Sequence, residues 1–264
     1  MSVIIEQYEN MMIVKNWTEA TKATYRSLLK KFLFEFKGNV QRATTDELIK
    51  YIASMPSRSS MAQMYGVLKN LYAHVLKQKR KFGFVPFPKK EFTIYKLIEH
   101  AELLKMCNLP RNTKHKLILN MLYGTGLRVS EICELKWSDI ERTGKPINPL
   151  ALVVNGKGNK QRRIPISSTI NQMLIAFCKE YKLNCDNSDD YIFGGKKPYS
   201  VRSVANICEK YCGVSPHKIR HAYSQWMHDN GTELETLRQL LGHNSLSTVQ
   251  IYARTKPEKI ITPV

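Results

Sequence analysis

The sequence contains no long hydrophobic run and no tract of low complexity. Its apolar segments, such as Leu150–Val154, fall far short of the roughly 20 residues that a helix needs to span a bilayer. No signal peptide opens the chain, so we expect a cytoplasmic protein that is neither secreted nor held in a membrane. With 264 residues the chain has room for one large domain or two smaller ones.

Paired cysteine motifs are also missing. The six cysteines include no CxxC pair, and no pair of histidines at ligand spacing accompanies Cys208 and Cys212, which are four residues apart on an expected helix. We therefore expect no metal site, and we expect the cysteines to be buried free thiols in a reducing compartment. Nor does the sequence show carboxylates arranged as in two-metal nucleases.

Acidic residues are scarce. The chain has 22 Asp and Glu against 41 Lys and Arg, a formal net charge of +19. An excess of this size favours a polyanionic partner, because basic side chains that neutralise phosphates release counterions on binding. A membrane surface fits less well, since no long amphipathic helix concentrates the charge. The alternative that stays open is a basic protein whose charge serves only its solubility.

The first 80 or so residues follow helical spacing. Thr18 precedes one segment with apolar residues on one side, and Ser57 precedes another. Between them, Thr44 and Glu47 have the spacing of a capping box. We expect three to four short helices that bury a small core.

A basic linker is expected after these helices. Residues 79–93 combine prolines and glycine with five positive charges, which is typical of an extended segment, although a surface loop within one domain is the alternative. The expected division is a helical domain over residues 1–80, a linker over 81–94 and a second domain over 95–264. Within that second domain, Leu152–Asn155 and Arg162–Ile166 predict a β-hairpin among helices.

Five short motifs in the second domain carry polar residues that could act in catalysis, and each is weak alone. The GTG ahead of Arg128 is not a dinucleotide fingerprint, and the GKG around Lys157 lacks the spacing of a P-loop. A lone HxxR, here His217 to Arg220, is as often a surface ion-pair pattern. By themselves, His243 and Tyr252 are typical of packing positions.

Taken together and in order, these motifs resemble the tyrosine recombinase (phage integrase) family, and among its members the short Xer-type proteins most. The resemblance covers roughly residues 115–255, whereas the first 80 residues resemble the family's core-binding domain only in pattern. It implies a mainly α fold: an N-terminal helical core-binding (SAM-like) domain and a C-terminal α-rich catalytic domain with a small β-sheet or hairpin. The two would form a C-shaped clamp on DNA. The strings that carry it are GTGLRVSE (124–131), GKGNK (156–160), SPH (215–217), RHA (220–222), LLGH (240–243), ST (247–248) and IY (251–252).

The resemblance implies a role for each motif residue. Tyr252 would be the nucleophile that forms a 3′-phosphotyrosyl link and leaves a 5′-hydroxyl. Two arginines would grip the non-bridging oxygens of the scissile phosphate, a task that suits guanidinium forks. A histidine near the tyrosine would exchange its proton, a lysine would protonate the leaving oxygen, and a second histidine would donate to the phosphate. The two arginines would be Arg128 and Arg220, and the histidine near the tyrosine would be His217. The lysine would be Lys157, and the second histidine would be His243.

Further residues are candidate DNA contacts or supports. In the second domain these would be Lys160, Arg162 and Arg163, as phosphate contacts, and Lys160 is the alternative to Lys157 as the lysine that protonates the leaving oxygen. The first domain offers Lys22, Arg26, Arg58 and Lys69, for each of which a solvated helix face is the alternative. Glu131 would hold the helix that follows Arg128, with a solvated carboxylate as the alternative, and His221 would be a structural neighbour of Arg220. No metal, ATP or other cofactor is implied.

The function expected from the resemblance is site-specific DNA recombination in the cytoplasm, in association with the nucleoid. A homo-tetramer would act on two copies of a specific duplex site, for integration and excision of a mobile element or for resolution, and a monomer in solution is compatible with this. The sequence identifies neither a directionality factor nor a partner recombinase. A type IB topoisomerase-like enzyme and a DNA-binding regulator that does not cleave are the alternatives.

Overall fold

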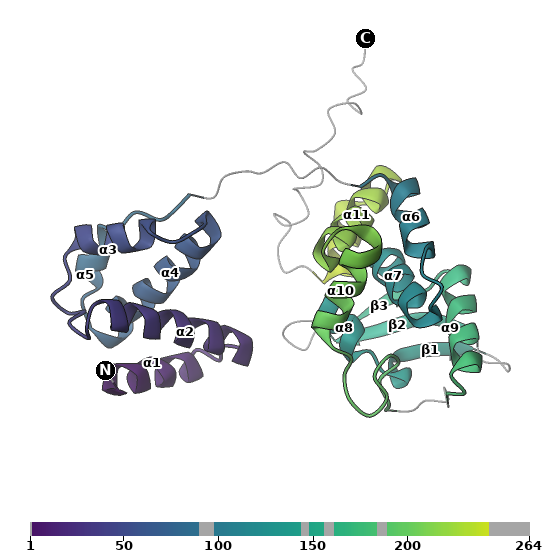
Figure 1. The fold of residues 1–264 in the computed structure, drawn as a ribbon, viewed down its shortest axis with the longest axis horizontal. Helices are drawn as coiled ribbons and strands as arrows, with labels where there is room; N and C mark the ends of the chain where they lie inside the picture. The colour runs from purple at the N-terminus through teal and green to yellow at the C-terminus, as the bar shows by residue number, and fades with distance from the viewer. Residues whose placement is uncertain (1, 90–97, 144–147, 156–160, 184–188, 243–264) are drawn as a thin grey trace, which may run out of the picture. The chain divides into compact units, whose positions relative to one another are not determined.

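The chain forms two compact units, Met1–Thr93 and Ile94–Val264, here called unit 1 and unit 2, each with its own hydrophobic core (Figure 1). The expected fold class, mainly helical with a small antiparallel sheet in the second part of the chain, is confirmed. No helix among the described residues is long and apolar enough to cross a membrane. The computed structural model describes residues 2–89, 98–143, 148–155, 161–183 and 189–242.

Unit 1 is helical, and side-chain caps fix where its longer helices begin. Thr18 and Ser57 each accept a backbone N–H from the first turn of the helix that follows, and Thr44 forms a capping box with Glu47. These three helix starts agree with the sequence prediction. The elements of unit 1 are α1 (Ser2–Val14), α2 (Glu19–Glu35), α3 (Thr45–Ala53), α4 (Arg58–Asn70), the π-helical turn η1 (Leu71–Val75) and α5 (Lys79–Gly83).

Two fully buried tyrosines connect distant parts of unit 1. Tyr8 on α1 donates its hydroxyl to the carbonyl of Val67 at 3.1 Å, and Tyr72 of η1 donates to the carbonyl of Val40 at 2.5 Å. Each bond satisfies a hydroxyl that burial would otherwise leave unpaired. The continuous α4–η1 segment therefore holds both α1 and the connection between α2 and α3.

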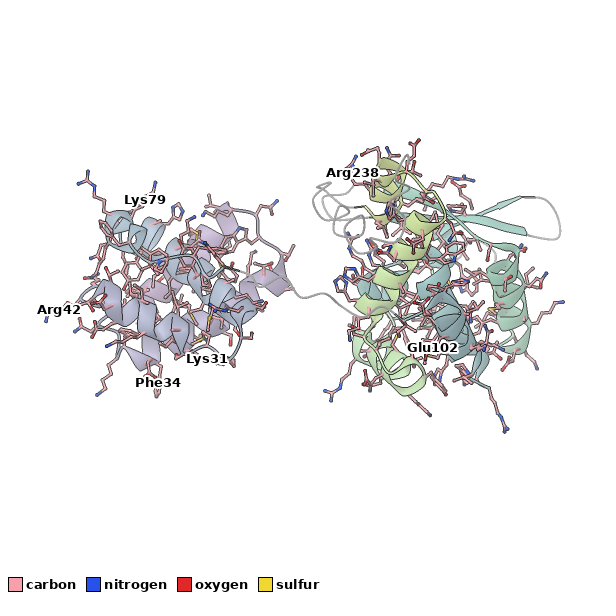
Figure 2. All side chains as sticks on the ribbon, turned by 90° about the horizontal axis from the view of Figure 1, so that it is seen from above. Lys31, Phe34, Arg42, Lys79, Glu102 and Arg238 are labelled. Carbon is pink, nitrogen blue, oxygen red and sulfur yellow. The ribbon has the colours of Figure 1, made fainter. Side chains whose placement is uncertain are left out.

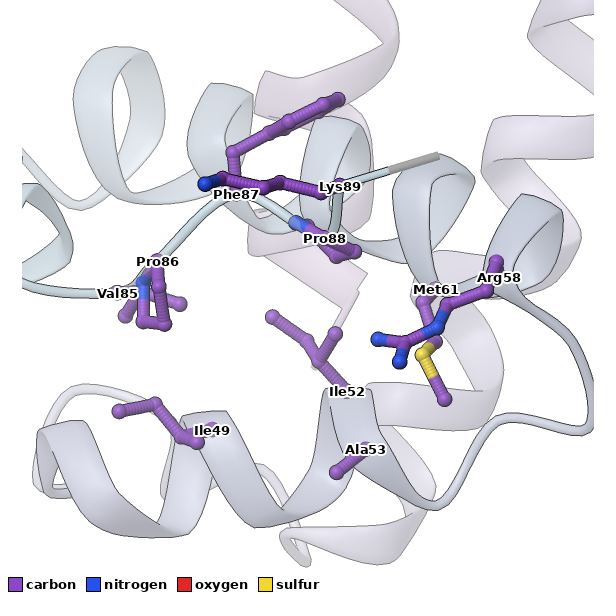
Figure 3. A pocket seen from close by; sticks show the side chains of 10 residues that line it. All are labelled: Ile49, Ile52, Ala53, Arg58, Met61, Val85, Pro86, Phe87, Pro88 and Lys89. Carbon is purple, nitrogen blue, oxygen red and sulfur yellow. The ribbon is translucent and has the colours of Figure 1, made fainter. Parts of the chain in front are cut away.

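The start of the expected linker belongs to the core of unit 1. Phe82 on α5 and Val85 are each 4% exposed within that core. The structure thus differs from the extended segment that charge and proline predict, because burial of these two apolar side chains holds the segment against unit 1. The residues after them border a hollow of about 490 Å³ (Figure 3), which is lined by Ile49, Ile52, Ala53, Arg58, Met61, Val85, Pro86, Phe87, Pro88 and Lys89.

Unit 2 is organised around the buried helix α7, which packs against α6, α9, α10 and α11. Its side chains from Leu117 to Tyr123 are all buried, so the helix is covered on every side, as expected for a central helix. The helices of unit 2 are α6 (His100–Asn108), α7 (Thr113–Thr125), α8 (Val129–Glu134), the 3₁₀ turn η2 (Trp137–Asp139), α9 (Ser168–Glu180), α10 (Val201–Cys212), α11 (Pro216–Asp229) and α12 (Leu234–Leu241).

A three-stranded antiparallel sheet of order β1-β2-β3 completes unit 2. Its strands are β1 (Ile140–Thr143), β2 (Asn148–Asn155) and β3 (Gln161–Pro165). The β2–β3 hairpin confirms the prediction, with Leu152 opposite Ile164 and Val154 opposite Arg162. Strand β1 was not predicted, because only Ile140 in it is a strong apolar signal.

The cysteines agree with the expectation only in part. Cys107, Cys133, Cys208 and Cys212 are buried free thiols. Cys178 differs, because it is disulfide-bonded. Within the described residues, no group of three or more His, Cys, Asp or Glu side chains is placed to hold a metal ion.

Candidate active site

The turn between α7 and α8 places Arg128. Gly126 ends α7 in the left-handed region with φ of 61°, and a Cβ there would lie 2.6 Å from Cε1 of Tyr223. Glycine alone fits both this backbone conformation and this space. Two residues later, Arg128 occupies the extended N-cap position of α8, with its side chain 34% exposed.

Helix α11 brings a second arginine to the same turn. Ser215 is the N-cap of α11 and Pro216 follows as its first residue, which fixes where the helix begins. One turn later, Arg220 is 4% exposed and donates from one terminal nitrogen to the carbonyl of Gly126. Its other terminal nitrogen donates to the carbonyl of Leu241 at 2.6 Å.

A buried carboxylate joins these arginines to a third one. Glu131 accepts from the backbone N–H of Arg128 at 2.7 Å and from the guanidinium of Arg128 at 2.8 Å. It also accepts two hydrogen bonds from Arg162, at 2.9 and 2.7 Å, and Arg220 lies 3.9 Å away. Burial alone would raise the pKa of the Glu131 carboxyl, but the hydrogen bonds from Arg162 and from the Arg128 backbone outweigh it and hold the pKa at about 2. The expectation that Glu131 supports the Arg128 helix is confirmed.

The three arginines meet at the C-terminal end of α12. Gly242 ends this helix with φ of 61°, as the sequence predicts for its C-cap. Arg128 donates to the carbonyl of Gly242 at 3.0 Å, and Arg162 donates to that of Leu240 at 2.8 Å. With the bond from Arg220 to Leu241, three successive carbonyls at the negative end of the helix dipole are paired with cations.

Arg128, Arg162, Arg220 and Glu131 are here called the arginine cluster. Three guanidinium groups against one carboxylate leave two positive charges in a half-buried place. Preorganised cations of this kind stabilise a nearby anion more strongly in a low-dielectric site than in water. The cluster is therefore suited to stabilise an anion beside Arg128, its most exposed member.

Two histidines lie next to the cluster on α11. The Nε2 atoms of His217 and His221 are 2.9 Å apart, and the two rings meet edge to face. Burial, followed by the charges of Arg220 and Arg128, lowers the pKa of His217. Burial, followed by His217 and Arg220, lowers the pKa of His221 to about 4. Both rings are therefore neutral near pH 7, so His217 can accept a proton there.

The structure brings together part of the predicted site. Arg128 and Arg220 bind carbonyls at the end of α12. His217 is one turn before Arg220 on α11, where the charges of both arginines lower its pKa. Lys157, Lys160, His243 and Tyr252 lie outside the described residues. The ends of the flanking elements are nonetheless known: β2 and β3 border the segment that contains Lys157, and Gly242 directly precedes His243.

Arg162 and Arg163 have different surroundings, although both were expected to contact phosphates. Arg163 is 59% exposed and pairs with Glu141 at 2.5 Å. The side chain of Arg162 is 7% exposed, and its three nitrogens donate to Glu131 and Leu240. This placement favours a supporting role for Arg162 over the expected phosphate contact. The sequence could have predicted the burial of Arg162 from the alternation of side chains along a strand, because Arg162 and the buried Ile164 lie on the same face of β3.

The candidate DNA contacts of unit 1 lie on two helices. On α2, Lys22 pairs with Glu19 at 2.8 Å and Arg26 pairs with Glu9 at 2.5 Å. On α4, Arg58 and Lys69 are exposed, at opposite ends of the helix. Arg58 also borders the hollow of unit 1.

Comparisons with known proteins agree with one another. The sequence matches the Phage integrase family over residues 96–259. It is 31% identical to Tyrosine recombinase XerA of Pyrococcus horikoshii over 96% of this chain and 89% of that protein. It is 25% identical to Tyrosine recombinase XerC of Bacillus pumilus over 97% and 90% of the two chains. In fold it is similar to a lambda integrase fragment solved as a dimer bound to a COC′ core site, with a TM-score of 0.73, 16% identity and coverage of 98% and 97%.

Proposed function

The chain belongs to the phage integrase family, and on that premise we propose that it is a site-specific recombinase that uses Tyr252 as its nucleophile. It breaks and rejoins DNA strands, as tyrosine recombinases do. The match to recombinases over almost the whole chain favours this activity over DNA relaxation or binding alone.

The arginine cluster is the observation that carries the proposal. Transfer of a phosphoryl group gathers negative charge on the non-bridging oxygens of the phosphate. Arg128 and Arg220 are fixed before any ligand binds, because Glu131 and the carbonyls of α12 already hold them. These two guanidinium groups therefore need little rearrangement to bind the negative charge that forms in the transition state.

In the proposed reaction, the phenol oxygen of Tyr252 attacks the scissile phosphorus while the bond from phosphorus to the 5′-oxygen breaks. The phenol proton passes to His217, whose lowered pKa keeps it neutral and able to accept. Lys157 gives a proton to the departing 5′-oxygen, and His243 donates to the phosphate. Rejoining runs these steps in reverse with a 5′-hydroxyl as the nucleophile, and the phosphotyrosyl ester conserves the energy of the broken bond.

The partner is DNA, and the proposal extends to how it is bound. Unit 1 would serve as the core-binding domain through α2 and α4, on which Lys22, Arg26, Arg58 and Lys69 lie. Unit 2 would supply the chemistry, with Arg163 as a phosphate contact. A tetramer on two duplex sites would exchange the strands in pairs.

Trapping on a nicked suicide substrate tests the proposal. Loss of the short fragment after cleavage prevents rejoining, so the wild-type protein should accumulate a covalent adduct on DNA that contains its site. Tyr252→Phe should bind the same DNA and form no adduct. An adduct that persists in Tyr252→Phe would contradict the proposed nucleophile, and no wild-type adduct on any fragment of the native genome would favour the binding-only alternative.

A further inference from the structure

We propose that Arg162 is a positioning residue: it neutralises Glu131 and holds the end of α12, and it thereby keeps the guanidinium of Arg128 available for the scissile phosphate. The inference rests on the proposed function and deepens it. It replaces the expected role of Arg162 as a DNA contact.

Arg162 and Arg128 compete for Glu131. One carboxylate oxygen accepts from both Arg128 at 2.8 Å and Arg162 at 2.9 Å. The other accepts from the Arg128 backbone at 2.7 Å and from Arg162 at 2.7 Å. Two-pronged pairing with Arg162 satisfies most of the charge of Glu131. Without Arg162, the carboxylate would bind Arg128 more tightly and draw it away from a phosphate.

Arg162 also packs against the end of α12. The remaining nitrogen of the Arg162 guanidinium, Nε, donates to the carbonyl of Leu240 at 2.8 Å. A Cβ on Gly242 would lie 3.1 Å from a terminal nitrogen of Arg162 and 3.3 Å from its Cδ. The backbone of Gly242 therefore rests directly on the Arg162 side chain. This is the same Gly242 whose carbonyl accepts from Arg128.

Arg162 is also close in sequence to the segment that contains Lys157. It is the second residue of β3, the strand that follows the segment containing Lys157. Its partner Glu131 is on α8, whose N-cap is Arg128, and its partner Leu240 is in the last turn of α12, three residues before His243. One buried side chain thus ties together three segments that carry proposed catalytic residues.

A direct DNA contact fits this geometry poorly. The charge of Arg162 is already neutralised by its two-pronged pair with Glu131, whereas the equally buried Arg220 donates to neutral carbonyls. A lysine could keep the charge but could not form the two-pronged pair and the bond to Leu240 at once. Arg162→Lys should therefore lose part of the effect of Arg162, and Arg162→Met should lose all of it.

The test measures single-turnover cleavage of the suicide substrate and DNA affinity separately. Arg162→Met should cleave about 100-fold more slowly, because small displacements of a catalytic group have effects of that order. Its Kd for DNA and the salt dependence of binding should stay close to the wild-type values. Arg162→Lys should fall between. A phosphate contact would instead weaken binding and reduce the salt slope by about one, which would overturn the inference.

A double-mutant cycle separates charge compensation from a loss of folding. If Arg162 acts by neutralising Glu131, then Arg162→Met combined with Glu131→Gln should cleave faster than the product of the two single effects predicts. Purely additive effects would overturn the inference. The matched control is Arg238→Gln, which removes an ion pair with Glu235 from the surface of the same α12 (Arg238 is labelled in Figure 2). It should cleave at the wild-type rate.

A second readout uses a scissile methylphosphonate, which lacks one charged oxygen. The deficit of Arg162→Met should shrink on this substrate if the defect lies in handling that charge, and it should stay unchanged if the variant is merely misfolded. Should the wild-type protein form no adduct at all, the proposed function fails. A crystal structure of Arg162→Met would then still decide the inference. Unchanged contacts from Arg128 to Glu131 and Gly242 would overturn it.

Discussion

Two glycines that end helices in the same conformation should respond very differently to alanine. Gly126 ends α7 with φ of 61° and Gly213 ends α10 with φ of 62°. A Cβ on Gly213 would meet nothing within 4 Å, whereas one on Gly126 would lie 2.6 Å from Tyr223 Cε1 and 3.2 Å from Leu241 Cδ2. The pair therefore separates the cost of the backbone conformation from the cost of the clash.

The magnitudes follow from that difference. The left-handed conformation costs an alanine about 1–2 kcal/mol, and this is all that Gly213→Ala should lose in free energy of unfolding. Gly126→Ala should lose about 2–5 kcal/mol, since forcing extra volume into a packed core adds about 1–3 kcal/mol. It should also slow DNA cleavage, because the carbonyl of Gly126 accepts from Arg220.

Urea unfolding followed by circular dichroism, together with single-turnover cleavage, provides the measurement. Gly213→Ala should cleave at the wild-type rate under conditions where both variants are folded. Equal losses of stability in the two variants would refute the reasoning, because they would mean that the packing of Tyr223 against Gly126 does not constrain the turn. Normal cleavage by a destabilised Gly126→Ala would show that the turn does not position Arg220.

Further predictions concern unit 1 and the effect of pH. Phe82→Ala should lower the free energy of unfolding of unit 1 by about 3–5 kcal/mol, because Phe82 is 4% exposed. Phe84→Ala should change that free energy little, because the Phe84 side chain is 78% exposed. Equal effects of the two substitutions would place α5 outside the core. Because burial, His217 and Arg220 lower the pKa of His221 to about 4, the unfolded chain takes up this proton first as the pH falls. The free energy of unfolding should therefore decrease as the pH falls from 6.5 to 4. His221→Gln should weaken this pH dependence, which thermal melts at a series of pH values would measure. An unchanged pH dependence in His221→Gln would argue against a buried neutral ring.

Much of the fold follows from local signals in the sequence. The capping oxygens of Thr18, Thr44 and Ser57 begin helices where they were predicted to, and the glycine at 242 ends one. Such signals can be read because each depends on a hydrogen bond or a dihedral angle within a few residues. The same holds for the β2–β3 hairpin, whose strands are separated by a glycine-rich segment.

The rest depends on contacts between distant residues, which local patterns do not encode. Phe82 sits among lysines, and only the core of unit 1 shows why a helix forms there. Likewise, Arg162 and Arg163 are chemically identical neighbours, yet one is buried against Glu131 and the other faces solvent. Motif order could group Arg128, His217 and Arg220, but it could not reveal that the carbonyls at the end of α12 hold two of them.

In the proposed reaction, a tyrosine works with the arginine cluster to take over one end of a DNA strand. Trypsin digestion of the trapped adduct, followed by mass spectrometry, tests it most directly, because cleavage after Arg238 and Arg254 isolates the peptide that contains Tyr252. The account predicts a nucleotide attached to that peptide at Tyr252, and a loss of the adduct in Arg220→Met. A nucleotide attached to another residue, or an adduct that forms equally well in Arg220→Met, would contradict it.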